Sequence, residues 1–160
     1  MRVKGTVNVL DPIDIKLLRC LQENARQSAS AIGEKVKLSV SAVIERIRKL
    51  EAVGVIMQYT VILNGKQIGK GVTAFISVRM DHPKFNDSFI DGITKLSGVM
   101  ECHYIAGDYD YLLKVAADST EELTQLLGMI KAIQGVSLTK TMIVLSTEKN
   151  SLIPLPEASD

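Results

Sequence analysis

The chain lacks tryptophan altogether, and aromatic residues make up only 4% of its 160 residues. Aliphatic side chains must therefore fill the core, and an apolar fraction of 46% is sufficient for one. Cysteine is also scarce: Cys20 and Cys102 alone argue against a disulfide framework and fit a reducing compartment. No apolar run reaches about 18 residues and the start has no apolar signal core, so we expect a cytoplasmic protein without a membrane span.

A net charge of only +1 argues against a protein that binds any nucleic acid through bulk electrostatics. The charges are nevertheless unevenly distributed. Residues 1–64 contain ten Lys or Arg against six Asp or Glu, a balance of +4, whereas residues 65–160 contain nine against twelve, a balance of −3. A basic first part and an acidic second part indicate a different partner for each.

The basic part shows the pattern of three short helices. Ser39 is a good N-cap for the third helix, and Gly54 is a good left-handed stop for it. A turn of only three residues, beginning at Lys37, separates the second helix from the third. Two helices joined in this way are typical of a helix-turn-helix, which places its second helix in the major groove of DNA. The helices are expected at residues 11–24, 28–36 and 40–53.

Helical spacing gives the third helix an apolar stripe, centred on Ile47, and an opposite polar face. The first turns of a recognition helix usually contact base edges, which serine, alanine, glutamate and arginine side chains can all read. Arg46 lies nearer the core edge, where it would pair with a carboxylate or reach a phosphate. Arg26 and Ser28 could also contact phosphates. The candidate DNA-binding residues are Arg26, Ser28, Ser39, Ser41, Ala42, Glu45, Arg46, Arg48 and Lys49.

The alternative interpretation is a three-helix bundle whose charged face is simply exposed to solvent, because most runs of charged residues have no other role. The short turn, the short preceding helix and the charge asymmetry favour DNA binding.

Residues 55–63, VIMQYTVIL, are rich in β-branched side chains and predict a strand. The glycines that follow, beginning with Asn64-Gly65, mark a break. We therefore expect a helix-turn-helix domain at residues 1–54, a linking strand and hinge at 55–71, and a second domain at 72–160.

The second domain alternates strands with helices and is expected to be a ferredoxin-like βαββαβ unit, which makes the fold class α+β. Both faces of the last strand carry apolar residues. Because two helices can cover only one face of a sheet, the other face should meet a second subunit. The strands are expected at residues 72–80, 99–106, 111–117 and 136–147, and the helices at 83–96 and 119–133.

Three separated stretches resemble the Lrp/AsnC (feast/famine) family of transcription regulators and occur in that family's order. They are LDPIDIKLLRCLQENAR, VKLSVSAVIERIRKLEAVGVIMQY and GVMECHYIAGDYDYLLKV, and the resemblance covers residues 10–155. It implies a winged-helix-like helix-turn-helix, a linking strand, and a C-terminal sandwich that binds ligand and dimerises through its sheets. Dimers are expected to assemble further, into tetramers, octamers or larger rings. One departure is Lys37, where the family commonly has glycine.

The resemblance also implies that a small amino acid binds at the loop Gly107-Asp108-Tyr109-Asp110, at the junction between dimers. The chemistry suits a zwitterion, because a carboxylate can accept from the ammonium and loop N–H groups can donate to the carboxylate. A plain hairpin loop is the alternative, since turns favour Gly and Asp for local reasons. The candidate effector-binding residues are Met100, Tyr104, Gly107, Asp108, Tyr109, Asp110, Thr139 and Thr141.

No catalytic or metal-binding pattern is present. Cys102 and His103 should point to opposite faces of their strand, which opposes shared metal ligation. There is no P-loop, dinucleotide fingerprint or nucleophile elbow, so we expect no cofactor and no enzyme. Two alternatives stay open: an enzyme like the sirohaem decarboxylases of this fold, for which His103 is the only candidate histidine, and an architectural protein that wraps DNA without sequence preference.

The sequence therefore predicts a sequence-specific DNA-binding transcriptional regulator. It should act as a homo-oligomer on a near-palindromic operator in double-stranded DNA and be modulated by a small amino acid.

Overall fold

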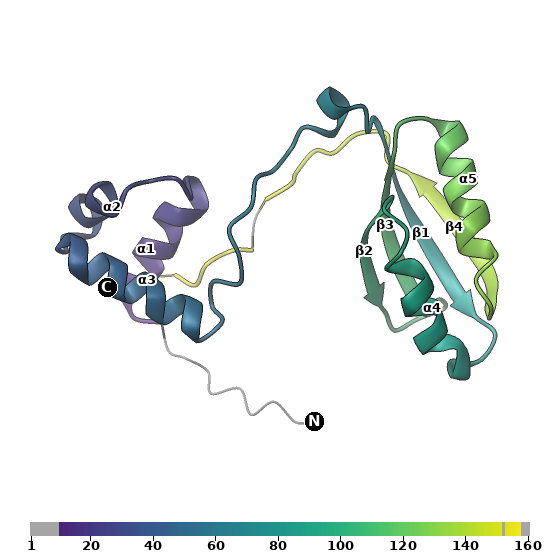
Figure 1. The fold of residues 1–160 in the computed structure, drawn as a ribbon, viewed down its shortest axis with the longest axis horizontal. Helices are drawn as coiled ribbons and strands as arrows, with labels where there is room; N and C mark the ends of the chain where they lie inside the picture. Colours follow the sequence, from purple (N-terminus) through teal and green to yellow (C-terminus); the bar gives the residue numbers. More distant parts are fainter. Residues whose placement is uncertain (1–9, 152, 158–160) are drawn as a thin grey trace. The chain divides into compact units, whose positions relative to one another are not determined.

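The computed structural model describes residues 10–151 and 153–157, which form two compact units (Figure 1). The first unit consists of the described residues up to Val61 together with those from Lys149 onward, and the second is Ile62–Glu148. The first is helical and the second combines a sheet with helices. The predicted α+β class is confirmed.

The helical unit contains α1 (Pro12–Glu23), α2 (Ala29–Val36) and α3 (Val40–Ala52). Each helix begins with a side-chain cap, in which Asp11, Ser28 and Ser39 accept from the backbone N–H three residues further on. Such a cap stabilises a helix by about 1 kcal/mol. Strong local caps explain why the sequence located all three helices to within about a residue.

The core of the helical unit is aliphatic. Leu17 and Val43 are completely buried, and Ile32 is nearly so. The C-terminal tail also belongs to this unit: Leu155 packs against the core, and the Gln22 side-chain amide donates to the Ile153 carbonyl at 3.0 Å. The sequence predicted this tail to be part of the other domain.

The strand predicted over residues 55–63 does not form in this single chain, and the described part of the helical unit contains no strand, so it has no wing. A strand needs a hydrogen-bonded neighbour, and none of the described strands lies beside this segment in the sheet. Its side chains are left outside instead: Met57 is 90% exposed and Ile62 75%. A short 3-10 turn, Gly65–Ile68, follows before the sheet begins.

The sheet unit runs β1 (Val72–Met80), α4 (Asn86–Ile93), β2 (Val99–Tyr104), β3 (Tyr111–Ala117), α5 (Thr120–Lys131) and β4 (Val136–Ile143). The strand order is β2-β3-β1-β4 and every neighbouring pair is antiparallel, which confirms the ferredoxin-like topology. The helix predicted over residues 83–96 is shorter, because a 3-10 turn at Pro83–Phe85 precedes it. β2 and β4 also end earlier than predicted.

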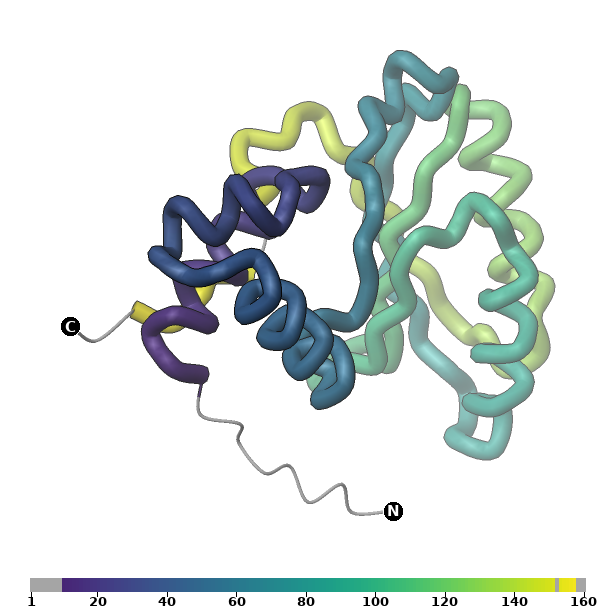
Figure 2. The backbone as a smooth tube through the Cα atoms, turned by 60° about the vertical axis from the view of Figure 1, so that its left-hand side comes forward, coloured from purple at the N-terminus to yellow at the C-terminus, as the bar shows by residue number. Residues whose placement is uncertain are grey.

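Helices α4 and α5 cover one face of this sheet (Figures 1 and 2). On that face, Ala74, Ile76 and Val78 of β1 are completely buried. The alternate residues of β1 lie on the other face, which we call the open face. Cross-strand register puts three rows there: Glu101–Lys114–Phe75–Met142, His103–Leu112–Ser77–Lys140, and Arg79–Leu138.

Candidate DNA-binding and effector-binding sites

The turn between α2 and α3 depends on two backbone features. Lys37 adopts the left-handed conformation, with φ 57° and ψ 47°, and lies in the tight turn that the sequence predicted to begin there. The chain then folds so closely over Gly33 that a Cβ there would lie 2.6 Å from the Leu38 carbonyl oxygen. Sequence reasoning missed Gly33, although a glycine inside a helical pattern is a signal of close packing.

The first turns of α3 present a polar surface. The Ser39 hydroxyl accepts from the Ala42 N–H at 3.3 Å and lies 3.1 Å from the Ser41 hydroxyl. Ser41, Glu45 and Arg48 follow at helical spacing, and each is exposed. Lys49 is also exposed and Ala42 is partly buried. The structure therefore groups these predicted residues on one accessible face.

Arg46 has a different environment from the arginine two residues later. Its Nη1 donates to Asp11 Oδ2 at 2.6 Å and to Asp14 Oδ1 at 2.7 Å, so it ties α3 to the start of α1. These two hydrogen bonds raise the pKa of Arg46. Burial alone would raise the pKa of Asp11, but the Asp14 N–H and the Arg46 guanidinium outweigh it, so the net shift is downward. The predicted pairing with a carboxylate is confirmed.

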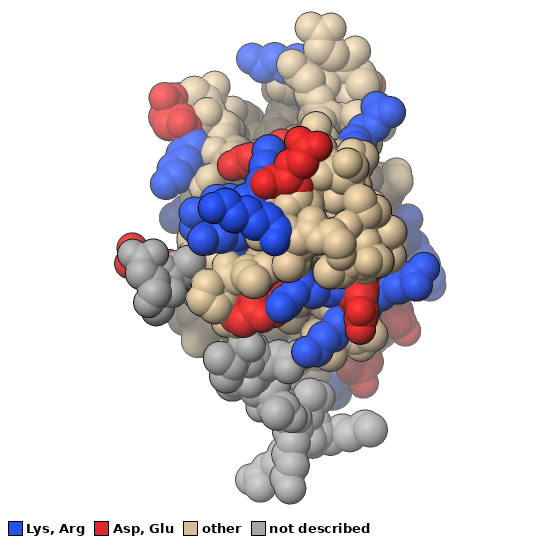
Figure 3. Space-filling model, turned by 90° about the vertical axis from the view of Figure 1, so that its left-hand side faces the viewer, with Lys and Arg blue, Asp and Glu red and all other residues tan. Residues whose placement is uncertain are grey.

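A shallow hollow of about 310 Å³ lies beside this ion pair, lined by Asp11 and four residues of α3. Those four, Ala42, Glu45, Arg46 and Lys49, are all among the predicted DNA-binding residues. Figure 3 views the helical unit from outside and shows Lys and Arg in separate groups with Asp and Glu among them. The charge pattern is therefore mixed, and a uniform basic field is not what marks this face.

Arg26 and Ser28 lie at the start of the helix-turn-helix. The Ser28 hydroxyl caps α2 by accepting from the Ala31 N–H at 3.1 Å, and it keeps its own proton as a donor. The Arg26 N–H donates to the Asn24 side chain at 2.9 Å, which shapes the short loop while the Arg26 side chain stays exposed.

The Gly107 loop is held firmly against the end of β1. The Asp110 carboxylate accepts from the Met80 N–H at 2.7 Å, and the Asp110 N–H donates to the Val78 carbonyl at 3.0 Å. Gly107 has φ 144°, which favours glycine. Asp110 is thus already engaged by the backbone, whereas Asp108 is exposed.

Arg79 of β1 contacts the Gly107 loop through its side chain. Its Nε donates to the Asp108 carbonyl at 2.9 Å, and its guanidinium carbon lies 5.4 Å from the centre of the Tyr109 ring. No local sequence pattern predicts this role, because only the strand register brings Arg79 beside the loop. Tyr104 is near the same end, with its ring 5.2 Å from that of Tyr111.

The remaining predicted effector residues are not brought to the loop within one chain. Met100 lies four residues before Tyr104 along β2, a separation of about 13 Å. Thr139 and Thr141 pair with Val78 and Ile76, two strands away from β3. They share the helix-covered face with those partners.

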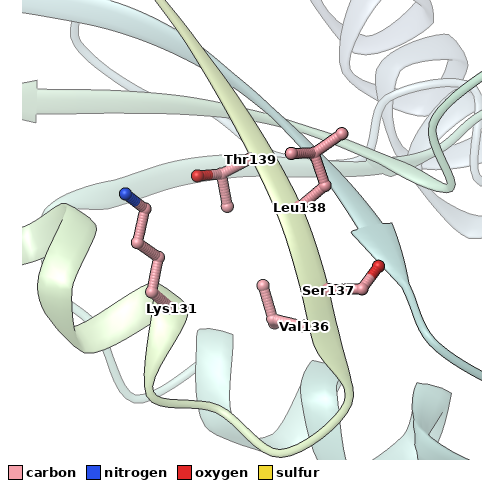
Figure 4. Close-up of a pocket in the computed structure, with 5 residues that line it drawn as sticks. All are labelled: Lys131, Val136, Ser137, Leu138 and Thr139. Atoms are coloured by element: carbon pink, nitrogen blue, oxygen red, sulfur yellow. The ribbon is translucent and has the colours of Figure 1, made fainter.

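Thr139 instead contributes to a shallow pocket of about 300 Å³ along β4. Figure 4 shows Thr139 and Lys131 on the same side of the strand. The pocket is also lined by Val136, Ser137 and Leu138. It is therefore built from β4 and the end of α5 rather than from the Gly107 loop.

Cys102 and His103 lie on opposite faces, as alternation predicted, because their partners Leu113 and Leu112 do. His103 Nε2 is 3.1 Å from a Glu101 oxygen. Among the described residues there is no group of three or more metal-ligating side chains. None of the helices that the structure describes is long and apolar enough to span a membrane.

Comparison with known families identifies both units. The model of the AsnC-type helix-turn-helix domain matches residues 10–51, and the model of the Lrp/AsnC ligand binding domain matches residues 73–153. The chain belongs to the Lrp/AsnC family. The first match covers almost all of α1 to α3, and the second covers all of the sheet except Val72. The segment that lacks its predicted strand lies between the two matches.

Individual Lrp/AsnC relatives match over most of their length. A glutamate uptake regulatory protein from Zymomonas mobilis is 36% identical over 159 residues, which is 96% of this chain and 96% of that protein. The crystal structure of a Neisseria meningitidis transcriptional regulator in complex with L-methionine has a TM-score of 0.86 at 30% identity, covering 91% of this chain and 96% of that one. A feast or famine regulatory protein from M. tuberculosis, complexed with L-methionine, has a TM-score of 0.86 at 31% identity, covering 92% and 99%. This Lrp/AsnC protein is a DNA-binding transcriptional regulator.

Proposed function

We propose that this regulator reads a specific operator in double-stranded DNA with the exposed face of α3. Ser41, Glu45 and Arg48 would contact base edges, with the Ala42 methyl beside them. An arginine fork matches guanine, a carboxylate accepts from cytosine, and an alanine methyl can touch thymine. The observation that carries the proposal is that these polar side chains are accessible while Val43, on the opposite side, is completely buried.

Other residues would position the protein through phosphates. Arg26, Ser28 and Lys49 offer exposed donors, and Ser39 keeps a hydroxyl proton while capping α3. Arg46 is assigned a supporting role instead. Two carboxylates already occupy its guanidinium, so a phosphate would have to compete with them.

A second copy of the chain is proposed to cover the open face of the sheet. Leu138 and Met142 are 46% and 42% exposed there, although they belong to strand positions that a partner sheet would bury. A symmetric dimer would present two copies of α3, which requires a near-palindromic operator. Assembly into tetramers or octamers, and formation of the strand at residues 55–63, would follow from further pairing.

The effector is proposed to be a small amino acid at the Gly107 loop. The exposed Asp108 carboxylate suits an ammonium group. Two structurally similar regulators are complexed with L-methionine, and one relative is named for glutamate uptake. We therefore assign the effector to the amino acids as a class, and not to one particular amino acid. Met100, Thr139 and Thr141 would join the site only if another subunit supplies them. An effector that favours one assembly over another would change DNA affinity.

Selection of bound sequences from random double-stranded DNA tests this function. The full-length protein is used, with and without a mixture of amino acids. We expect one enriched near-palindromic sequence and a changed yield when amino acids are present. Equal affinity for selected and random DNA at fixed salt would indicate an architectural protein instead.

We propose no catalytic role for the chain, and we place its action in the cytoplasm. The only candidate catalytic histidine, His103, lies against Glu101 on the face that a second copy would cover. Turnover of an added tetrapyrrole would overturn this assignment and favour the sirohaem-decarboxylase alternative.

A further inference from the structure

Arg79 is the next-to-last residue of β1 and lies in the last row of the open face, beside the Gly107 loop. Three contacts fix its position. The Ser137 hydroxyl donates to the Arg79 carbonyl at 3.0 Å, the Arg79 Nε donates to the Asp108 carbonyl at 2.9 Å, and the guanidinium lies over the Tyr109 ring. The backbone carbonyl and one guanidinium nitrogen are therefore held by hydrogen bonds, and the Tyr109 ring lies against the rest of the group.

Among the residues that the structure describes, no acidic side chain forms an ion pair with this guanidinium. The ion pairs formed by the described residues engage Arg46, Lys70, His103 and Lys114, and none of them includes Arg79. The Asp108 atom that Arg79 contacts is the carbonyl oxygen, so the Asp108 carboxylate does not neutralise it. Nη1 and Nη2 consequently form a cationic fork of N–H donors whose orientation is fixed before any ligand arrives.

We propose that Arg79 binds the carboxylate of the effector through Nη1 and Nη2. A planar fork of this kind takes a carboxylate in bidentate fashion, and its fixed orientation reduces the entropy lost on binding. The carboxylate is either the α-carboxylate of any amino acid or the side-chain carboxylate of an acidic one. This inference rests on the proposed effector function of the Gly107 loop and adds to it the residue that recognises the anionic group.

The loop has supports that do not depend on Arg79. The Ile105 N–H donates to the Asp110 carbonyl at 2.8 Å, and Asp110 makes its two contacts with Val78 and Met80. Replacing Arg79 should therefore remove the ligand's partner without releasing the loop. Two variants separate these effects: Arg79→Gln removes the charge, and Arg79→Lys keeps the charge but loses the fork.

Calorimetric titration of the full-length protein with matched probes tests the proposal. L-methionine is compared with L-methioninamide, in which a neutral carboxamide replaces the α-carboxylate. L-glutamate is compared with L-glutamine, in which a neutral carboxamide replaces the side-chain carboxylate. We expect wild type to prefer the carboxylate of at least one pair by about 10- to 100-fold. In Arg79→Gln that preference should fall close to one, and in Arg79→Lys it should be intermediate.

The pair whose preference collapses identifies which carboxylate Arg79 binds. Lys95→Gln is the matched control, because it also removes one exposed positive charge but far from the loop. Lys95 lies three residues before Gly98, whose carbonyl accepts from the Ala116 N–H at the end of β3 opposite the Gly107 loop. Unchanged preferences in Arg79→Gln would overturn the inference and leave the effector function standing. If wild type binds none of the four probes, the inference and the proposed effector function both fail. Parallel titrations with DNA keep the DNA-binding function separately testable.

Discussion

The helical unit and the sheet unit each bury one apolar side, but they leave different chemistry outside. The helical unit pairs Arg46 internally and leaves Ser41, Glu45 and Arg48 exposed. The sheet unit covers one face with helices and leaves an open face on which Leu138 and Met142 remain about half exposed. A polar, partly cationic surface suits a wet and charged partner, whereas an apolar sheet face suits another protein surface. The two units are therefore built for different partners.

The largest effect should come from charging the open face. Met142→Asp places a carboxylate on the open face opposite the Phe75 ring, where a second sheet would pack, and burying it unpaired is too costly for the dimer to persist. We expect sedimentation to show monomers at concentrations where wild type is assembled. Met129→Asp is the matched control, since Met129 of α5 is 50% exposed but lies on a helix. Equal assembly of the two variants would contradict the role of the open face.

Gly33→Ala should break the turn of the helical unit. The added Cβ would lie 2.6 Å from a backbone oxygen, and such overpacking costs about 1–3 kcal/mol. The free energy of unfolding, measured with urea, should decrease by that amount. Gly128→Ala in α5 meets no atom within 4 Å and should instead stabilise the sheet unit by about 0.5–1 kcal/mol. A stable Gly33→Ala protein would show that the α2–α3 turn can open.

Arg48→Ala and Arg46→Ala should distinguish a residue that contacts DNA bases from one that stabilises the helical unit. Loss of Arg48 should weaken operator binding by about 1–3 kcal/mol without changing the urea midpoint. Loss of Arg46 should lower the midpoint, since it leaves two carboxylates unpaired, and should reduce operator affinity less than Arg48→Ala does. Fluorescence anisotropy and urea titration of both variants measure the two effects. The reverse order of affinities would mean that Arg46, and not Arg48, enters the groove.

Acid should produce the smallest effect, and it should act on each unit through a different carboxyl. The pKa of Asp11 is lowered, so its contribution to stability is present above the unfolded pKa and is lost as the pH falls through the lowered one. The same holds for Glu101, whose pKa the Lys114 ammonium and then His103 lower. Both units should thus lose stability below about pH 4.

Residue-resolved NMR during urea titrations can assign these losses. Asp11→Asn should flatten the pH dependence of the helical unit alone, and Glu101→Gln that of the sheet unit alone. A change that spreads to both units in either variant would show that they unfold together.

Much of the helical unit could be predicted because its signals are local. Asp11, Ser28 and Ser39 cap their own helices, and Arg46 falls at the core edge by helical spacing alone. The ferredoxin-like topology was also predictable, from the order of strands and helices. The strand predicted at residues 55–63 is absent from the single chain for the opposite reason: β-branched composition favours an extended chain but does not supply a neighbour to pair with.

The sequence by itself determined the helix-turn-helix, the strand–helix order and the loop at Gly107, because caps, periodicity and turn residues act over a few positions. Only the tertiary structure decided which charged groups remain available to partners. Strand register set Arg79 beside Asp108, and packing of α3 on α1 neutralised Arg46. Register and packing join residues about 30 positions apart, and no local pattern carries that information.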